Sequence, residues 1–161
     1  MKIAKMTRIS LLLALAMVLG YIESLIPFFF GIPGMKLGLA NLMTVLVLFA
    51  YSEKEAILLN ILRITLLGFL FGNLFGIVYS MTGAVVSFAA MVIARRLLKW
   101  NITWCSIMGG IFHNVGQVLL ACLIIENINV LYYLPGLLIS GLIAGFLIGI
   151  LGDILLNRGI L

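Results

Sequence analysis

Long apolar runs divide this chain into segments, and short polar clusters separate one run from the next. Typical separators are Ser52-Glu53-Lys54-Glu55, Gly72-Asn73 and Glu126-Asn127. A helix needs about 20 mostly apolar residues to cross a bilayer. The pattern predicts six membrane-spanning helices, at about residues 9–27, 37–51, 56–71, 74–94, 104–125 and 131–156.

The composition agrees with an all-α integral membrane protein. Of the 161 residues, 65% are hydrophobic and 9% are charged, whereas soluble domains have about 25% charged residues. Six spans of about 20 residues occupy most of the chain and leave no room for a soluble domain. We therefore expect a single transmembrane domain over residues 1–161.

Basic residues are distributed unevenly between the two sides of the predicted membrane. With six spans, both termini share one side, which holds eight of the ten Lys and Arg residues: Lys2, Lys5, Arg8, Lys54, Arg95, Arg96, Lys99 and Arg158. Lys36 falls on the opposite side, and Arg63 lies within a span. Because positive charge near span ends favours the cytoplasmic side, both termini are expected in the cytoplasm.

Several kinds of chemistry are excluded by the residues themselves. Asp153 is the single aspartate, so paired aspartates cannot hold Mg²⁺ against a diphosphate. No glycine directly precedes a lysine, which excludes a P-loop ATPase. Cys105 and Cys122 form no CxxC or Cys/His cluster. We expect no catalytic residues, no metal or other cofactor and no nucleic-acid partner, since the basic residues lack a solvated face.

Polar residues inside the predicted spans are the candidates for a binding site. A charge within the bilayer costs about 2.5–3.5 kcal/mol on insertion scales, so it needs a partner or a function. If these side chains converge, they form an outward-facing pocket for an amphiphilic anion, with an apolar lining for its hydrophobic part. The candidate substrate-binding residues are Glu23, Lys36, Asn41, Arg63, Asn73, Ser80, His113, Asn114 and Gln117.

A purely structural interpretation of the same residues stays open. Arg63 and Glu23 could form a buried ion pair, and His113 could be a hydrogen-bonded core residue. Asparagine and glutamine side chains also bond one membrane helix to another. Against this, Glu23 can neutralise only one of the two cations, Lys36 and Arg63.

Small residues recur at four-residue spacing in two predicted spans. Gly141, Gly145 and Gly149 form one such stripe, and the first span offers Ser10 with Ala14. Small residues allow close approach of helix backbones, which drives association in lipid. We expect the glycine stripe to pack internally, whereas for the small residues of the first span both internal packing and packing against another protein stay open.

Residues 33–41, Pro-Gly-Met-Lys-Leu-Gly-Leu-Ala-Asn, closely resemble the PG-x-KLGLAN signature of the Gx transporter family, also called heptaprenyl diphosphate synthase component I. The resemblance continues through Arg63, residues 72–75, residues 79–80, residues 109–110, residues 113–117 (His-Asn-Val-Gly-Gln) and residues 132–135. It therefore covers nearly the whole chain.

This family is similar to the substrate-binding S components of energy-coupling factor (ECF) transporters. The resemblance implies a six-helix bundle in the bacterial cytoplasmic membrane that takes a small molecule from outside, while a transmembrane T component and two ATPases supply energy. S components commonly dock through an AxxxA motif on the first helix, where this chain has Ser10 and Ala14. The ligand class stays open between an isoprenoid or quinone precursor and a vitamin-like molecule.

Two other functions remain as alternatives. The family's synthase name fits a non-catalytic membrane partner of prenyl diphosphate or menaquinone biosynthesis. A standalone secondary carrier would need an ionisable residue for coupling, and Glu23, Arg63 and His113 are the candidates.

Overall fold

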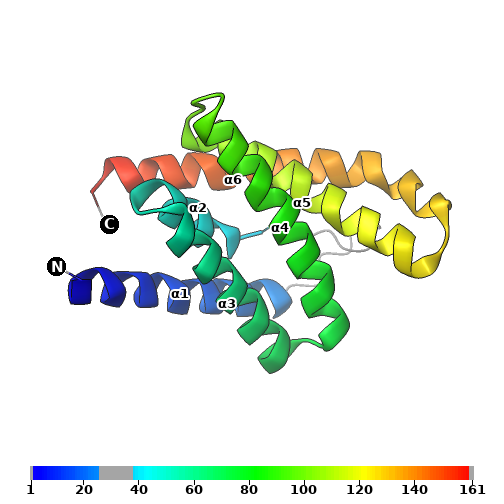
Figure 1. Cartoon of the computed structure of the whole chain (residues 1–161), viewed down its shortest axis with the longest axis horizontal. Helices are drawn as coiled ribbons and strands as arrows, with labels where there is room; N and C mark the ends of the chain where they lie inside the picture. Colours follow the sequence, from blue (N-terminus) through cyan, green and yellow to red (C-terminus); the bar gives the residue numbers. More distant parts are fainter. Residues whose placement is uncertain (1, 26–37, 160–161) are drawn as a thin grey trace.

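The computed structural model describes residues 2–25 and 38–159, which are entirely helical apart from turns and short connections. Six α-helices and one short 3-10 helix follow one another along these residues (Figure 1). They are α1 (Lys2–Leu25), α2 (Asn41–Ala50), α3 (Glu53–Phe71), α4 (Leu74–Arg96), α5 (Ile102–Ile125), η1 (Ile128–Tyr133) and α6 (Leu134–Asn157).

Within the described residues, four helices are long and apolar enough to cross a membrane, at Ile3–Leu25, Leu74–Arg96, Ile102–Ile125 and Ile128–Asn157. The chain is therefore a multi-pass membrane protein. α3 has 19 residues, but its first turn carries Glu53 and Glu55 and its middle carries Arg63. α2 has ten residues, about 15 Å of helix, which is half the thickness of a bilayer core of about 30 Å. Six spans and cytoplasmic termini stay predictions.

Polar residues lie at the starts of two helices, close to where the sequence predicts the boundaries. Asn73 accepts a hydrogen bond from Gly76 N through its side chain, at 2.7 Å, and so caps the start of α4. Asn101 caps α5 in the same way through Trp104 N, at 3.1 Å. Asparagine is favoured at such positions because it satisfies a backbone N–H that has no partner within the helix. Membrane helices thus begin at polar residues that interrupt the apolar runs.

The short helix α2 lies at the centre of the bundle. It contacts α1, α3, α5 and α6, and every residue from Leu42 to Leu48 is buried. The main apolar core joins α2 to Leu12 and Ala16 of α1, Leu59 of α3 and Ile148 of α6. A helix that is apolar on all faces is expected to be surrounded by other helices. Its amino-terminal end, at Asn41, consequently lies inside the protein.

The glycine stripe of α6 packs against α5, which runs alongside it in Figure 1. A Cβ atom on Gly145 would lie 2.6 Å from the Ser106 carbonyl oxygen and 2.7 Å from the Ile107 Cα. One on Gly149 would lie 2.6 Å from the Thr103 Cα. These are backbone atoms, which cannot move aside as a flexible side chain can. Glycine therefore permits the close approach of the two helices.

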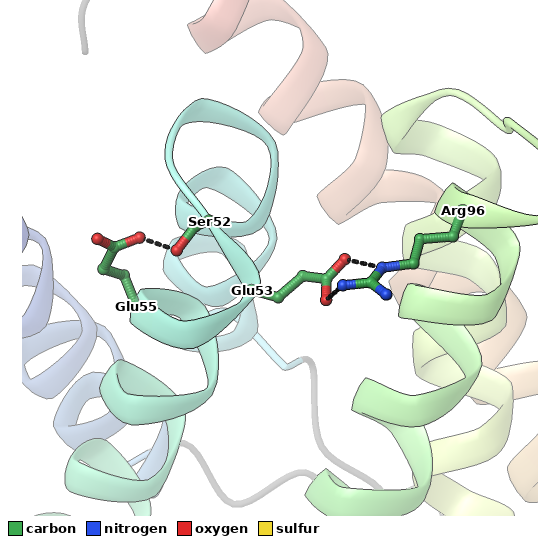
Figure 2. Close-up of polar contacts among 4 residues, drawn as sticks. All are labelled: Ser52, Glu53, Glu55 and Arg96. Carbon is green, nitrogen blue, oxygen red and sulfur yellow. Dashed lines mark hydrogen bonds and ion pairs between the residues drawn. The ribbon is translucent and has the colours of Figure 1, made fainter.

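Ion pairs fasten α3 to its neighbours at one end of the bundle. Glu53 accepts two hydrogen bonds from Arg96 of α4, 2.6 Å from Nε to Oε1 and 2.5 Å from Nη2 to Oε2 (Figure 2). Glu55 pairs with Lys5 of α1 and accepts from the Ser52 hydroxyl. The hydrogen bond from Lys5 and then that from Ser52 hold the pKa of the Glu55 carboxyl below its ordinary value. Exposed pairs of this kind contribute at most about 1 kcal/mol each.

The α5–α6 contact yields a stability prediction. At an unrestricted helix position, Gly→Ala stabilises by about 1 kcal/mol. Gly145→Ala should instead destabilise by about 1–3 kcal/mol, the usual cost of overpacking, because the new methyl group meets the backbone of α5. Thermal unfolding in detergent measures the change. Leu142→Ala, at an exposed position of the same helix, is the control and should change the midpoint little. A stabilised Gly145→Ala protein would contradict the close contact.

Candidate functional site

A cavity of about 240 Å³ opens among the helices and is lined by residues from each of α1 to α6. Its wall combines charged and amide side chains with apolar ones such as Val45, Leu67 and Ile148, and with several glycines. Ligand sites are typically concave and largely apolar, with a few placed polar groups. The cavity has this character, although its volume is somewhat below the usual range of about 300–1,000 Å³.

Most of the polar residues singled out in the sequence meet at this cavity. Eight of the nine candidates line it: Glu23, Asn41, Arg63, Asn73, Ser80, His113, Asn114 and Gln117. Lys36 lies outside the described residues. These eight come from five different helices or their caps, so the tertiary fold rather than sequence proximity collects them. The binding-site hypothesis requires these side chains to converge, and they do so at the cavity. Their role in binding a ligand stays a prediction.

Arg63 is the cation of this lining. Its Nη2 donates to the Asn60 Oδ1 at 2.6 Å and to the Asn41 Oδ1 at 3.0 Å. Asn60 is one turn away on α3, and Asn41 begins α2, so the guanidinium joins the two helices. Its Nε is buried and has no acceptor in the described part of the chain. A buried unsatisfied donor costs about 1–3 kcal/mol, more for a charged group.

Glu23 acts on Arg63 only through space. Its carboxylate is near enough for Coulombic attraction to the guanidinium, but the ion pairs of the described residues do not include one between these two side chains. Glu23 instead accepts a hydrogen bond from the Gly38 N–H at 2.5 Å. Gly38 has φ of +71°, a conformation that glycine adopts without strain. The carboxylate thus ties the end of α1 to the residues that lead into α2.

The amide side chains of α5 line the cavity, and they also take part in contacts with neighbouring helices. Asn114 is buried, and its Nδ2 donates to the Leu137 carbonyl oxygen of α6 at 2.5 Å. Gln117, also buried, lies where α4 comes close: a Cβ on Gly83 would be 2.8 Å from the Gln117 Cγ and 2.9 Å from the His113 carbonyl oxygen. Asn114 therefore links two helices in addition to lining the cavity. This agrees in part with the structural interpretation of the amides.

Three serines in the lining were not among the residues predicted from the sequence. Ser24 follows Glu23 on α1, Ser87 lies on α4 and Ser106 on α5. Ser87 and Ser106 are almost completely buried. In the sequence, a hydroxyl within an apolar run could have pointed to these lining residues. Serine also occurs at ordinary contacts between membrane helices, so the pattern alone does not identify a cavity. Only the fold distinguishes the two situations.

The two residues expected to dock a partner are on the outside of α1. Ser10 and Ala14 are both exposed, whereas Ala16 is fully buried in the core. A Cβ on Gly20 would meet the side chain of Leu67 of α3. The small residues of α1 are thus of two kinds, since Ala16 and Gly20 pack within the bundle. Ser10 and Ala14 remain available for lipid or protein.

The cavity has the chemistry of a binding site. Across residues 2–25 and 38–159, no group of three His, Cys, Asp or Glu side chains is placed to hold a metal ion. Cys105 and Cys122 are free thiols. The described residues of the lining offer one cation, one carboxylate, and amides and hydroxyls that can donate and accept hydrogen bonds. Such a set can hold and orient a polar group inside an apolar bundle.

The Asn114 bond gives a second stability prediction. Asn114→Leu should lower the free energy of unfolding by about 0.5–1.5 kcal/mol, because the side-chain hydrogen bond from α5 to the Leu137 carbonyl of α6 is lost. Thermal unfolding in detergent checks this value. Ser80→Ala, which alters another lining residue, should be nearly neutral, since Ser80 makes no hydrogen bond to another described side chain. Equal losses in both variants would refute a special role for the α5–α6 bond.

Comparison with known proteins relates the chain to one family. The family model described as "Heptaprenyl diphosphate synthase component I" matches residues 12–155. Comparisons with curated proteins and with solved structures gave no match. The matched region extends from α1 to α6 and includes the described lining of the cavity. This chain is a member of the heptaprenyl diphosphate synthase component I family.

Proposed function

We propose that this protein is the substrate-binding membrane subunit of an ECF-type importer. It takes a small amphiphilic, anionic molecule from the extracellular side into the cavity among α1 to α6. Isoprenoid or quinone precursors and vitamin-like molecules belong to this class. In this proposal the protein itself catalyses no reaction, and its partners supply the energy for transport.

The observation that carries the proposal is the environment of Arg63. A guanidinium in a multi-pass bundle is expensive to bury, and two neutral amides compensate it incompletely. The buried Nε still lacks an acceptor among the residues described, and Arg63 lines the cavity. A ligand oxygen supplies what this donor lacks. Charge-assisted hydrogen bonds of this kind are about twice as strong as neutral ones.

The rest of the lining favours a ligand with both polar and apolar parts. Val45, Leu67 and Ile148 offer apolar surface, while Asn41 and Gln117 can bond a polar group. A purely ionic ligand would leave the apolar wall unused. An amphiphile buries its apolar part, which stabilises the complex by about 25 cal/mol per Å².

The proposed division of labour is consistent with the chain's residues. It has no P-loop, so ATP hydrolysis needs separate subunits. α1 exposes Ser10 and Ala14, and small residues on a lipid-facing helix permit close approach of a partner helix. We propose this surface as the contact with a T component, with a pair of ATPases bound on the cytoplasmic side.

The family name favours a second candidate. "Component I" indicates a subunit that acts with another component, by name a non-catalytic one in prenyl diphosphate synthesis. A membrane subunit could present or receive an isoprenoid for a soluble synthase. The importer is preferred to a subunit that only recruits a soluble enzyme, because the polar groups gather at an internal cavity. A standalone carrier is a third possibility, for which uptake by the isolated protein in liposomes is the test.

Arg63→Ala provides the test of the binding site. The protein is gently extracted from its own membranes, and native mass spectrometry records any small molecule retained by it. We expect wild type to retain a ligand and Arg63→Ala to lose it, with at least a tenfold lower occupancy, while remaining folded and monodisperse. Asn60→Leu should weaken retention less, because Asn41 still positions the guanidinium. Equal retention in wild type and Arg63→Ala would refute the site.

A double substitution on α1 tests the partner. Ser10→Leu with Ala14→Leu should abolish co-purification of the T component and ATPases without changing ligand retention. Leu15→Phe alters an exposed neighbouring face of the same helix and should leave the complex intact. Recovery of wild type with a soluble prenyl synthase subunit, and without ATPases, would support the second candidate instead.

A further inference from the structure

The charge of the cavity wall sets a limit on the ligand. Of the described residues that line the cavity, Arg63 is the one cation and Glu23 the one carboxylate. The other polar lining groups are amides, hydroxyls and His113. Among the described lining residues, the formal charges of Arg63 and Glu23 therefore cancel. Counting Lys36, which lies outside the described residues, would add one positive charge and no more.

The Glu23 carboxylate is held at a position where it repels negative charge on a ligand. Its Oε1 accepts from the Gly38 N–H at 2.5 Å, and a charge-assisted hydrogen bond to backbone fixes the side chain. It also lines the same cavity as Arg63. An anion that approaches the guanidinium consequently approaches this carboxylate as well. In a low-dielectric interior, such repulsion is much stronger than in water.

Arg63 carries a single positive charge, and part of its guanidinium is already bonded to protein. Both hydrogens of its Nη2, two of the five guanidinium hydrogens, are committed, one to Asn41 and one to Asn60. The buried Nε has a single hydrogen and no acceptor from the described chain. Diphosphate sites usually require several cations or a metal ion. The described residues supply no group that could hold a metal.

From these observations we infer that the cavity selects an amphiphile with a single negative charge, of the carboxylate kind, and discriminates against the corresponding diphosphate. A carboxylate carries one charge, which Arg63 can balance. A phosphate monoester already carries about −1.5 to −2 at pH 7, and a diphosphate carries more. Its excess charge would face Glu23, and the described lining residues hold no second cation to compensate it. The inference rests on the proposed function and narrows the ligand class within it.

Three probes with one hydrocarbon chain and different head groups test this charge limit. They are geranic acid, geraniol and geranyl diphosphate, and their binding to the purified full-length protein in detergent is measured by calorimetry. For wild type we expect the acid to bind at least tenfold more tightly than the diphosphate, with the alcohol between them. Arg63→Ala should abolish the preference for the acid over the alcohol.

The Glu23→Gln variant tests whether the Glu23 carboxylate causes the discrimination between the acid and the diphosphate. This variant keeps a hydrogen-bond acceptor for Gly38 but removes the charge, so the ratio between acid and diphosphate affinities should fall at least tenfold. Ser24→Ala, next to it in the lining, is the matched control and should preserve the ratio. An unchanged ratio in Glu23→Gln would overturn the role of Glu23.

The remaining outcomes separate this inference from the proposed function. If wild type binds the diphosphate as tightly as the acid or more tightly, and Arg63→Ala abolishes that binding, the charge limit is wrong and the anion site stands. If no probe shows binding that depends on Arg63, the anion site is wrong, and the charge limit fails with it.

Discussion

The Arg63 guanidinium, partly buried in an apolar bundle, is the constraint around which the site is organised. Two amide oxygens, from Asn41 and Asn60, accept from the same nitrogen, and Glu23 contributes an attraction without a direct ion pair. This arrangement stabilises the cation partly and leaves Nε without an acceptor among the described groups. A purely structural arginine would be expected to pair with its carboxylate directly, because burial of an incompletely paired charge is costly.

Helix packing determines where that cation can lie. Gly145 and Gly149 bring α6 against the backbone of α5, and Gly83 does the same for α4 and α5 through His113 and Gln117. Close backbone contacts fix the relative position of these three helices. α3, which carries Arg63, makes fewer such contacts and is joined to α4 by the exposed pair of Glu53 and Arg96. The cavity therefore has one wall of close-packed helices and another built on side-chain contacts.

The sequence predicted the helices well where polar residues interrupt the apolar runs. Asn73 separates α3 from α4, and its cap bond to Gly76 shows why the boundary falls there. Polarity also identified most of the cavity wall, since a charged or amide side chain in an apolar run is costly unless it is used. Such a pattern cannot say which polar group bonds to protein. Asn114 is committed to Leu137 and Asn60 to Arg63, and both bonds depend on tertiary placement.

The position of α2 was a further limit of sequence reasoning. Its apolar run was interpreted as a span, but a run of this length fits a central buried helix equally well. In the fold, α2 is surrounded by four other helices. This placement brings Asn41, at its first turn, to Arg63, 22 residues later in the chain. Sequence spacing gives no hint of that contact.

The internal location of the polar groups also bears on the choice between importer and synthase partner. A subunit that only recruits a soluble enzyme needs polar groups at the membrane surface, where the enzyme can reach them. Here Arg63, Asn114 and Gln117 line a cavity inside the bundle, and the last two are buried. Hydrogen bonds within the protein offset part of their cost in the membrane, and a ligand that enters the cavity would offset more. An isoprenoid handed to a synthase would do so too, so the two functions differ in where the ligand goes afterwards and share the same binding step.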